Sequence, residues 1–247
     1  MSPESRCRHL PGMPAIACFA GLLAATAAAA SASAAGLTHL AHALLPAHGT
    51  LAGPLAPLLP AIACIVLFYA YALLLHRLLL HALPLRSGPV ESSVRAAFGY
   101  QLYLLFYLMV FNALIRSRVL PIPLMRPVYL ALGARLGART HTGGTILDPA
   151  FVTIGHDTLI GEAALLVPHV LEGGTPAHFP IVIGNHVTIG THAVLLAGVT
   201  VGDHALVAAH ALVAKGTVIG PGEVWGGVPA RRLRGARADL LQRGQTA

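Results

Sequence analysis

Histidine is the residue of the carboxy-terminal half whose chemistry stands out. Eight histidines occur from residue 136 onward, whereas residues 119–247 contain no serine and no cysteine. Covalent catalysis by a hydroxyl or thiol paired with histidine is therefore excluded for this half, and nothing marks a threonine for that role. Direct transfer remains, in which an imidazole of unperturbed pKa about 6.5 removes the proton from an attacking hydroxyl or amine. The eight are His141, His156, His169, His178, His186, His192, His204 and His210.

These histidines are embedded in a repeat with a period of six residues. Every sixth residue from Ile183 to Trp225 is apolar, and the next residue is often glycine. Upstream, the same phase contains Leu136, Ile154, Ile160 and Leu166. Thr142 and Asp148 also stand in this phase, but they fit the aliphatic pattern less well because they are polar. Short repeats of fixed period decide architecture, so this one defines a domain.

The period predicts an all-β domain over residues 136–235, a left-handed parallel β-helix. Six residues form one side of a triangular coil, and three sides complete a turn. One aliphatic residue per side points inward and stacks on its counterpart in the next coil, which builds a core that no single repeat could bury. Successive coils pair as parallel strands about 4.8 Å apart.

The repeat breaks between Leu166 and Ile183. Their separation is not a multiple of six, so residues 167–182 must leave the coil as a protruding loop. Of the eight histidines, only His169 and His178 lie in this loop, and loops held by a rigid scaffold often carry catalytic residues. We therefore predict His169 as the general base and His178 as the second candidate.

Two further pairs, His186 with His204 and His192 with His210, share the same phase of successive coils. We expect them at outward-facing corners, where polar side chains are usual. A metal-binding ladder is the alternative, because imidazole is a common zinc ligand. We predict no metal site.

The amino-terminal part is far more apolar and predicts a membrane region over residues 1–118. The whole chain is 55% hydrophobic and only 10% charged, with a mean hydropathy of +0.71, whereas soluble domains carry about 25% charged residues. Since about 20 apolar residues span a bilayer, we expect helices over about 14–35 and 57–80. A third apolar segment covers 98–115. We expect the first helix to be an uncleaved anchor; a cleavable signal is the alternative.

The arginines predict the topology. Arg6 and Arg8 precede the first helix and Arg77 and Arg86 follow the second, whereas the loop 36–54 has neither lysine nor arginine. The positive-inside rule then places both ends of this helical hairpin, and the β-helix domain, in the cytoplasm.

A third complete membrane crossing, at 98–115, would place the positively charged segment 116–139 on the outer side of the membrane. We therefore favour an interfacial or re-entrant element at 98–115 over an ordinary span. Three prolines then predict a linker at 119–135, and residues 236–247 form a short polar tail.

The net charge of +7 and the pI of about 9.9 favour a lipid surface as partner and exclude nucleic acid. Many arginines follow apolar segments, as suits anionic headgroups, and no nucleic-acid-binding motif accompanies them. The cysteines form no disulfide framework and no metal spacing. They are Cys7, Cys18 and Cys64.

The carboxy-terminal half resembles the hexapeptide-repeat acyltransferase superfamily. The resemblance rests on the run from Ile183 to Trp225, on His169 in its loop, and on the closing motif Gly227-Val-Pro-Ala-Arg231. That motif looks like the Gly-Asn-Pro-Ala-Arg/Lys closure of many such enzymes, with Val228 replacing asparagine. Residues 160–173 are similar to the membrane-associated, acyltransferase-like carboxy-terminal domains of polylysine-type non-ribosomal peptide synthetases.

The resemblance implies a homotrimer, an acyl-CoA or similar thioester as co-substrate, and a histidine base. It also implies that Glu172, three residues after His169, holds the imidazole in the required tautomer. Basic and closing-motif residues are implied to contact the phosphates of the donor. These are Lys215, Gly227, Pro229, Ala230, Arg231 and Arg232.

We therefore predict a multi-pass protein of a bacterial inner membrane, with an acyltransferase domain at the cytoplasmic face. It would move an acyl group from CoA, or from a carrier protein, to a hydroxyl or amine of a small-molecule or peptide acceptor. A non-catalytic trimeric scaffold, or accessory module of a synthetase or membrane complex, is the main alternative. A zinc hydratase is the third. The loop at 167–182 distinguishes the acyltransferase from the scaffold, because a scaffold needs only the coil.

Overall fold

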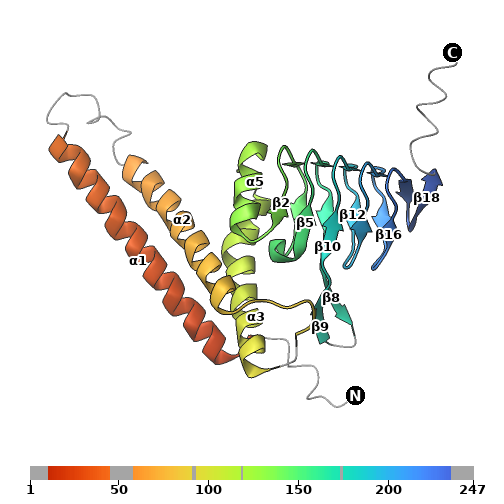
Figure 1. Ribbon diagram of the computed structural model, residues 1–247. Helices are drawn as coiled ribbons and strands as arrows, with labels where there is room; N and C mark the ends of the chain where they lie inside the picture. Colours follow the sequence, from red (N-terminus) through yellow and green to blue (C-terminus); the bar gives the residue numbers. More distant parts are fainter. Residues whose placement is uncertain (1–10, 45–57, 91–92, 118, 173–174, 235–247) are drawn as a thin grey trace.

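The computed structural model describes residues 11–44, 58–90, 93–117, 119–172 and 175–234 (Figure 1). Helices make up the amino-terminal part and lie against one end of a parallel β-helix. The predicted tail 236–247, residues Arg6 and Arg8, and part of the loop 36–54 lie outside the described residues. The helices are α1 (Met13–Leu44), α2 (Leu58–Ala82), α3 (Val94–Phe106), the π-helical turn η2 (Tyr107–Phe111), α4 (Asn112–Arg116) and α5 (Ile122–Ala131).

Three helices are long and apolar enough to cross a membrane, judged by length and composition. They cover Met13–Ala41, Leu58–Ala82 and Val94–Arg116. The second agrees with the expected 57–80, whereas α1 continues through Gly36 to Leu44, well beyond the expected end at 35. The third is one continuous helix made of α3, η2 and α4, longer than the apolar segment 98–115.

The expected linker at 119–135 contains helix α5, which its three prolines did not indicate. Pro121 precedes the helix, and Pro123 lies in its first turn. Backbone N–H groups in the first turn have no partner within the helix, so the N–H that proline lacks costs no hydrogen bond there. Pro127 is inside the helix. The helix persists because Met125 and Tyr129 are buried in the same apolar core as the first coil.

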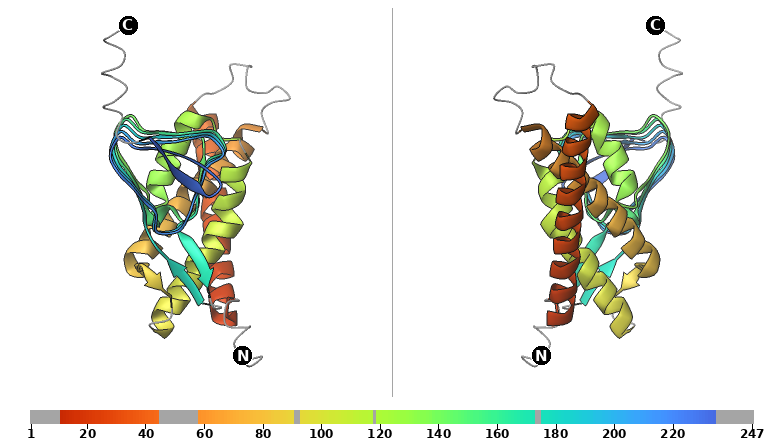
Figure 2. Two further views of the ribbon diagram at one scale, coloured as in Figure 1. Left: turned by 90° about the vertical axis from the view of Figure 1, so that its right-hand side faces the viewer. Right: turned by 90° about the vertical axis from the view of Figure 1, so that its left-hand side faces the viewer.

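The β-helix has three parallel sheets, one for each side of the coil, and the coils superimpose in a three-sided outline (Figure 2). The first sheet contains β2 (Arg135–Leu136), β5 (Val152–Ile154), β10 (Ile181–Ile183), β13 (Thr200–Val201) and β16 (Val218–Ile219). The second contains β3 (His141–Thr142), β6 (Leu159–Ile160), β11 (Thr188–Ile189), β14 (Leu206–Val207) and β17 (Val224–Gly227), with β18 (Ala230–Arg234) added antiparallel. The third contains β4 (Thr145–Ile146), β7 (Leu165–Leu166), β12 (Val194–Leu195) and β15 (Leu212–Val213).

The six-residue phase is confirmed as the set of inward positions. The aliphatic residues of the phase from Ile183 to Ile219 are all buried, and each pairs in register with its counterpart one coil away. Trp225 is only partly buried, because its indole N–H donates to Glu223 Oε2 (2.8 Å). From Ile183 to Ile219, the stacked core was therefore predicted correctly.

The first coil departs from the phase in a way that concerns Asp148. Ile146, not Asp148, is the inward residue here, because β4 pairs with β7 through Ile146 and Leu166. Asp148 follows in a left-handed conformation (φ 43°) and begins the 3-10 turn η3 (Pro149–Phe151). The in-phase interpretation of Asp148 is therefore wrong, and its side chain is free for another role.

The predicted loop is an antiparallel hairpin of β8 (His169–Glu172) and β9 (Thr175–His178). Strand β1 (Gly88–Pro89), which follows α2, pairs with the outer side of β9. In Figure 1 the hairpin projects from the coil toward the start of α3. The helical part thus holds the hairpin by backbone pairing.

Val201 fills the middle of one inward column. Val201→Ala should lower the free energy of unfolding by about 1–3 kcal/mol through a cavity and lost burial, measured by chemical denaturation in detergent. Val218→Ala is the matched control, because Val218 lies on the neighbouring strand with 68% of its surface exposed and should cost less than about 0.5 kcal/mol. Equal losses in both variants would contradict the assignment of the core.

Candidate active site

The carboxylate of Asp148 is the centre of the candidate site. Asp148 is only 4% exposed. The Tyr103 hydroxyl donates to its Oδ1 (2.9 Å), His169 Nδ1 bonds to its Oδ2, and His178 Nε2 lies 3.9 Å from the same Oδ2. A buried carboxylate is costly unless such partners satisfy it. These contacts therefore fix three side chains around one charge.

Three separate parts of the chain meet here. Tyr103 comes from α3, Asp148 from the turn after β4, and the histidines from the hairpin. Further tyrosine hydroxyls hold the turn: Tyr107 donates to the Ile146 carbonyl (3.2 Å) and Tyr129 to the Gly144 carbonyl (3.3 Å). The left-handed backbone of Asp148 is thus held from both sides by helices that precede the β-helix.

His169 has the geometry of a general base. Because Nδ1 is occupied by the Asp148 carboxylate, the hydrogen bond assigns the proton to Nδ1 and leaves Nε2 to accept another. The side chain is 46% exposed, so a substrate can reach it. The hydrogen bond to Asp148 raises the pKa of His169 above its ordinary value, against the opposing effect of burial.

His178 faces His169 across the hairpin but is enclosed. The two residues are register partners, with ring centroids 6.4 Å apart. The His178 ring stacks on Phe151 (4.2 Å) and meets the edge of Tyr100 (5.5 Å), and the side chain is only 2% exposed. Burial lowers its pKa, which keeps the imidazole neutral. The structure therefore brings together both predicted loop histidines and favours His169 as the base.

Glu172 does not orient His169, so that prediction is wrong. Its Oε2 pairs with Lys215 Nζ at 2.5 Å, and Lys215 also lies over the Phe179 ring, 4.8 Å from the centroid. The alternation of side chains along β8 separates the two residues, and the orienting carboxylate is Asp148. Lys215 therefore ties the hairpin to the coil.

The other residues predicted to bind the donor lie in the terminal hairpin β17–β18, at the far end of the coil from the helices (Figure 1). Arg232 Nη1 bonds to Glu223 Oε1 (3.0 Å), whereas the Arg231 side chain contacts the backbone of Ala230. Lys215 and Arg232 therefore pair with different acids, Glu172 and Glu223. The predicted donor-binding residues of the terminal hairpin are Gly227, Pro229, Ala230, Arg231 and Arg232.

Sequence reasoning missed Asp148 and Tyr103. Asp148 carried a signal, because it is an acid in a phase that is otherwise aliphatic. No sequence signal marked Tyr103, because an apolar aromatic segment does not indicate which tyrosine hydroxyl will contact a carboxylate that is distant in sequence.

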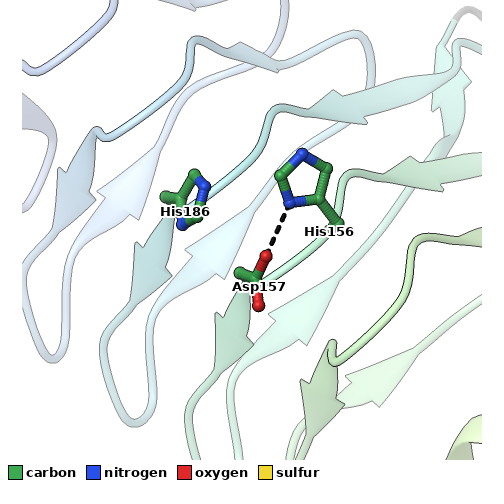
Figure 3. Close-up of side chains that lie close together, drawn as sticks. All are labelled: His156, Asp157 and His186. Carbon is green, nitrogen blue, oxygen red and sulfur yellow. Dashed lines mark hydrogen bonds and ion pairs between the residues drawn. The ribbon is translucent and has the colours of Figure 1, made fainter.

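A second cluster lies at a corner of the coil, where ligand atoms of His156, Asp157 and His186 are within 4.8 Å of one another (Figure 3). His156 Nδ1 lies 2.7 Å from Asp157 Oδ2. Arg139 binds the same carboxylate through two hydrogen bonds of 2.5 and 2.6 Å, and this contact is the main cause that lowers the pKa of Asp157. A metal ion would have to displace Arg139, so an ion-pair network accounts for the cluster.

The two histidine pairs occupy corners as predicted. All four residues have positive φ, between 55° and 61°, and their rings stack at 4.8 and 4.9 Å. They are His186 with His204 and His192 with His210.

The coil is thus a hexapeptide-repeat β-helix with a histidine–aspartate pair at its hairpin. Residues 180–215 match the family model described as "Bacterial transferase hexapeptide (six repeats)".

Among curated proteins, the chain is 38% identical over 123 residues to galactoside O-acetyltransferase of Escherichia coli (strain K12). The match covers 44% of this chain and 58% of that protein. A hexapeptide-repeat containing acetyltransferase from Vibrio cholerae O1 biovar eltor, solved with acetyl coenzyme A, is 34% identical over 41% of this chain and 60% of that one, with a TM-score of 0.38. A galactoside acetyltransferase in complex with coenzyme A is 33% identical over 44% and 58% of the two chains, with a TM-score of 0.39.

The Asp148 contact predicts a measurable change at His169. Asp148→Asn should lower the pKa of His169, because the imidazolium loses its anionic partner while burial continues to disfavour the charge. The measurement is an NMR titration of histidine-labelled protein, with the resonance assigned from His169→Gln.

Glu172→Gln is the control, since Glu172 pairs with Lys215. It should leave the pKa of His169 unchanged. The opposite pattern, with an effect from Glu172→Gln alone, would restore Glu172 as the orienting residue.

Proposed function

We propose that this protein is a membrane-tethered acyltransferase that moves an acyl group from a thioester to a hydroxyl or amine. The observation that carries the proposal is the pair of a buried Asp148 and a half-exposed His169, supported by the Tyr103 hydroxyl. A carboxylate that orients an imidazole and stabilises its cation is the arrangement that general-base catalysis requires.

The reaction follows from this geometry. His169 Nε2 takes the proton of the acceptor as the acceptor oxygen or nitrogen attacks the thioester carbonyl. The carbon–sulfur bond then breaks, and the imidazolium returns the proton to the departing thiolate. Asp148 stabilises the imidazolium between these events.

We propose acyl-CoA as the donor. The Escherichia coli relative is named for acetyl transfer, and basic side chains suited to phosphates lie on the coil. Arg231 and Arg232 are exposed. No step of the reaction requires a metal ion.

A non-catalytic scaffold would need only the coil. It would not need a buried charge, which costs stability unless several groups satisfy it, nor a hairpin that presents one imidazole to solvent. The site therefore favours the enzyme over the scaffold.

We further propose that α1 and α2 form the membrane hairpin and that α3 lies beside the domain without crossing. Exposed Ile62, Ile65 and Val66 on α2 suit contact with lipid. By contrast, Tyr103 of α3 and Tyr107 of η2 donate hydrogen bonds to Asp148 and to the Ile146 carbonyl of the first coil. A helix joined at mid-length to such a domain is unsuited to the bilayer core.

Assembly and topology are tested together on the full chain. Light scattering in detergent should return the mass of three 25.6-kDa chains, because the flat sides of the coil offer long faces for self-association. A reporter fused after residue 247 should be active in the cytoplasm, as the positive-inside rule requires. A monomer at micromolar concentration would contradict the trimer. A reporter active only in the periplasm would contradict the topology.

His169→Ala should reduce turnover roughly 10²–10⁴-fold, the usual loss of a general base, and should leave the fold intact because the side chain lies outside the stacked core. The measurement is thiol release from a panel of acyl-CoA donors in the presence of cell extract as the source of acceptor, with the melting temperature recorded in parallel.

His141→Ala is the matched control, because His141 is exposed on β3 and outside the hairpin. It should keep full activity. Near-native turnover of His169→Ala would show that this residue is not the base, and His178→Ala would then be tested. If both single variants remain active, the mechanism with a histidine base is wrong.

A further inference from the structure

A cavity of about 350 Å³ lies where the helical part meets the hairpin. Its walls come from the segment that follows α2, from the first turns of α3, and from His178 of β9. This volume is within the range of about 300–1,000 Å³ typical of small-molecule sites. The lining residues are Leu83, Pro84, Leu85, Arg86, Pro89, Val90, Ser93, Arg95, Ala96, Gly99, Tyr100 and His178.

The lining is apolar with two cations. Leucine, proline, valine and alanine side chains provide most of the wall, whereas Arg86 and Arg95 supply positive charge, and none of the lining residues that the structure describes is acidic. Arg95 also donates to the Ala82 carbonyl at the end of α2 (3.1 Å), which holds its guanidinium in place. The complementary ligand has an apolar body and an acidic group.

The cavity adjoins the candidate site through His178. His178 forms part of its wall, and the centroids of the His178 and His169 rings lie 6.4 Å apart. Backbone pairing of Gly88 with His178 fixes the cavity against the hairpin. A molecule bound here can therefore extend a nucleophile toward His169.

The position relative to the proposed membrane hairpin is also informative. The cavity opens directly after the carboxy-terminal end of α2, where the positive-inside rule places the cytoplasmic surface of the bilayer. Arginines at that depth attract anionic lipid headgroups. A ligand could thus arrive from the membrane without crossing water.

We propose that this cavity binds the acyl acceptor, and that the acceptor is a membrane amphiphile with an acidic headgroup and a free hydroxyl or amine. The proposal rests on the proposed function for the acceptor's role, whereas the binding of an acidic amphiphile stands apart from it. His178 then serves as the neutral inner wall that guides the acceptor past Asp148.

The first experiment measures binding without catalysis. Dodecyl phosphate should raise the melting temperature of the full chain, because a ligand that binds only the folded state stabilises it. Dodecanol should give a clearly smaller shift. Ala96→Phe, which fills the cavity, and Arg86→Gln, which removes a cation, should each abolish the difference between the two probes.

Matched controls lie outside the cavity. Val94→Phe changes a residue of the same helix that is 90% exposed, and Arg135→Gln removes an exposed arginine at the start of the coil. Both should respond to dodecyl phosphate as the wild type does. Equal shifts with dodecanol and dodecyl phosphate, or a full response in Ala96→Phe, would overturn the proposal.

The second experiment uses three acceptors with acyl-CoA: a monoacylglycerol phosphate, the matching monoacylglycerol, and glycerol 3-phosphate. The first should give the highest kcat/KM, and Ala96→Phe should lower that value by about tenfold or more. Transfer to glycerol 3-phosphate that Ala96→Phe leaves unchanged would refute the acceptor site and keep the acyltransferase. A thermal shift without transfer to any acceptor would refute the enzyme and keep the amphiphile site.

Discussion

The buried charge of Asp148 is the constraint on which the rest of the site depends. A carboxylate that is nearly removed from water must be satisfied by donors, and hydrogen bonds to charged groups are each worth about 1.5–3 kcal/mol. Its donors, Tyr103 and His169, belong to a helix and to a hairpin that are distant in sequence. One group therefore joins the helical part, the first coil and the hairpin, and orients the imidazole at the same time.

The coil supplies the rigidity that this arrangement requires. Its inward columns of isoleucine, valine and leucine are buried from Ile183 to Ile219. Helix α5, with Tyr129, covers the first coil, whereas β18 pairs with the last. The hairpin thus projects from a frame with a continuous buried core.

The contrast between what could and could not be predicted has a physical basis. A fixed period acts through local spacing, so the inward positions, the corners and the interruption at residues 167–182 were all readable from the residues alone. The partner of His169 was not, because a side chain can meet any acid that the fold brings near it. Glu172 is close in sequence but points to Lys215, whereas Asp148 reaches His169 through a turn that departs from the repeat. The prolines near α5 misled for a similar reason, since burial of Met125 and Tyr129 outweighed a weak local preference.

The pairing of β1 with β9 means that the β-helix cannot be treated as a portable catalytic module with an exchangeable anchor. A chain cut at residue 119 would keep every repeat and every histidine of the coil. It would also lose the strand that lines the hairpin and the phenol that satisfies Asp148. Such a fragment would be a folded coil with an unfinished site. Substitution in the helical part is therefore restricted where it touches the hairpin, and comparatively free along the exposed apolar surfaces of α1 and α2.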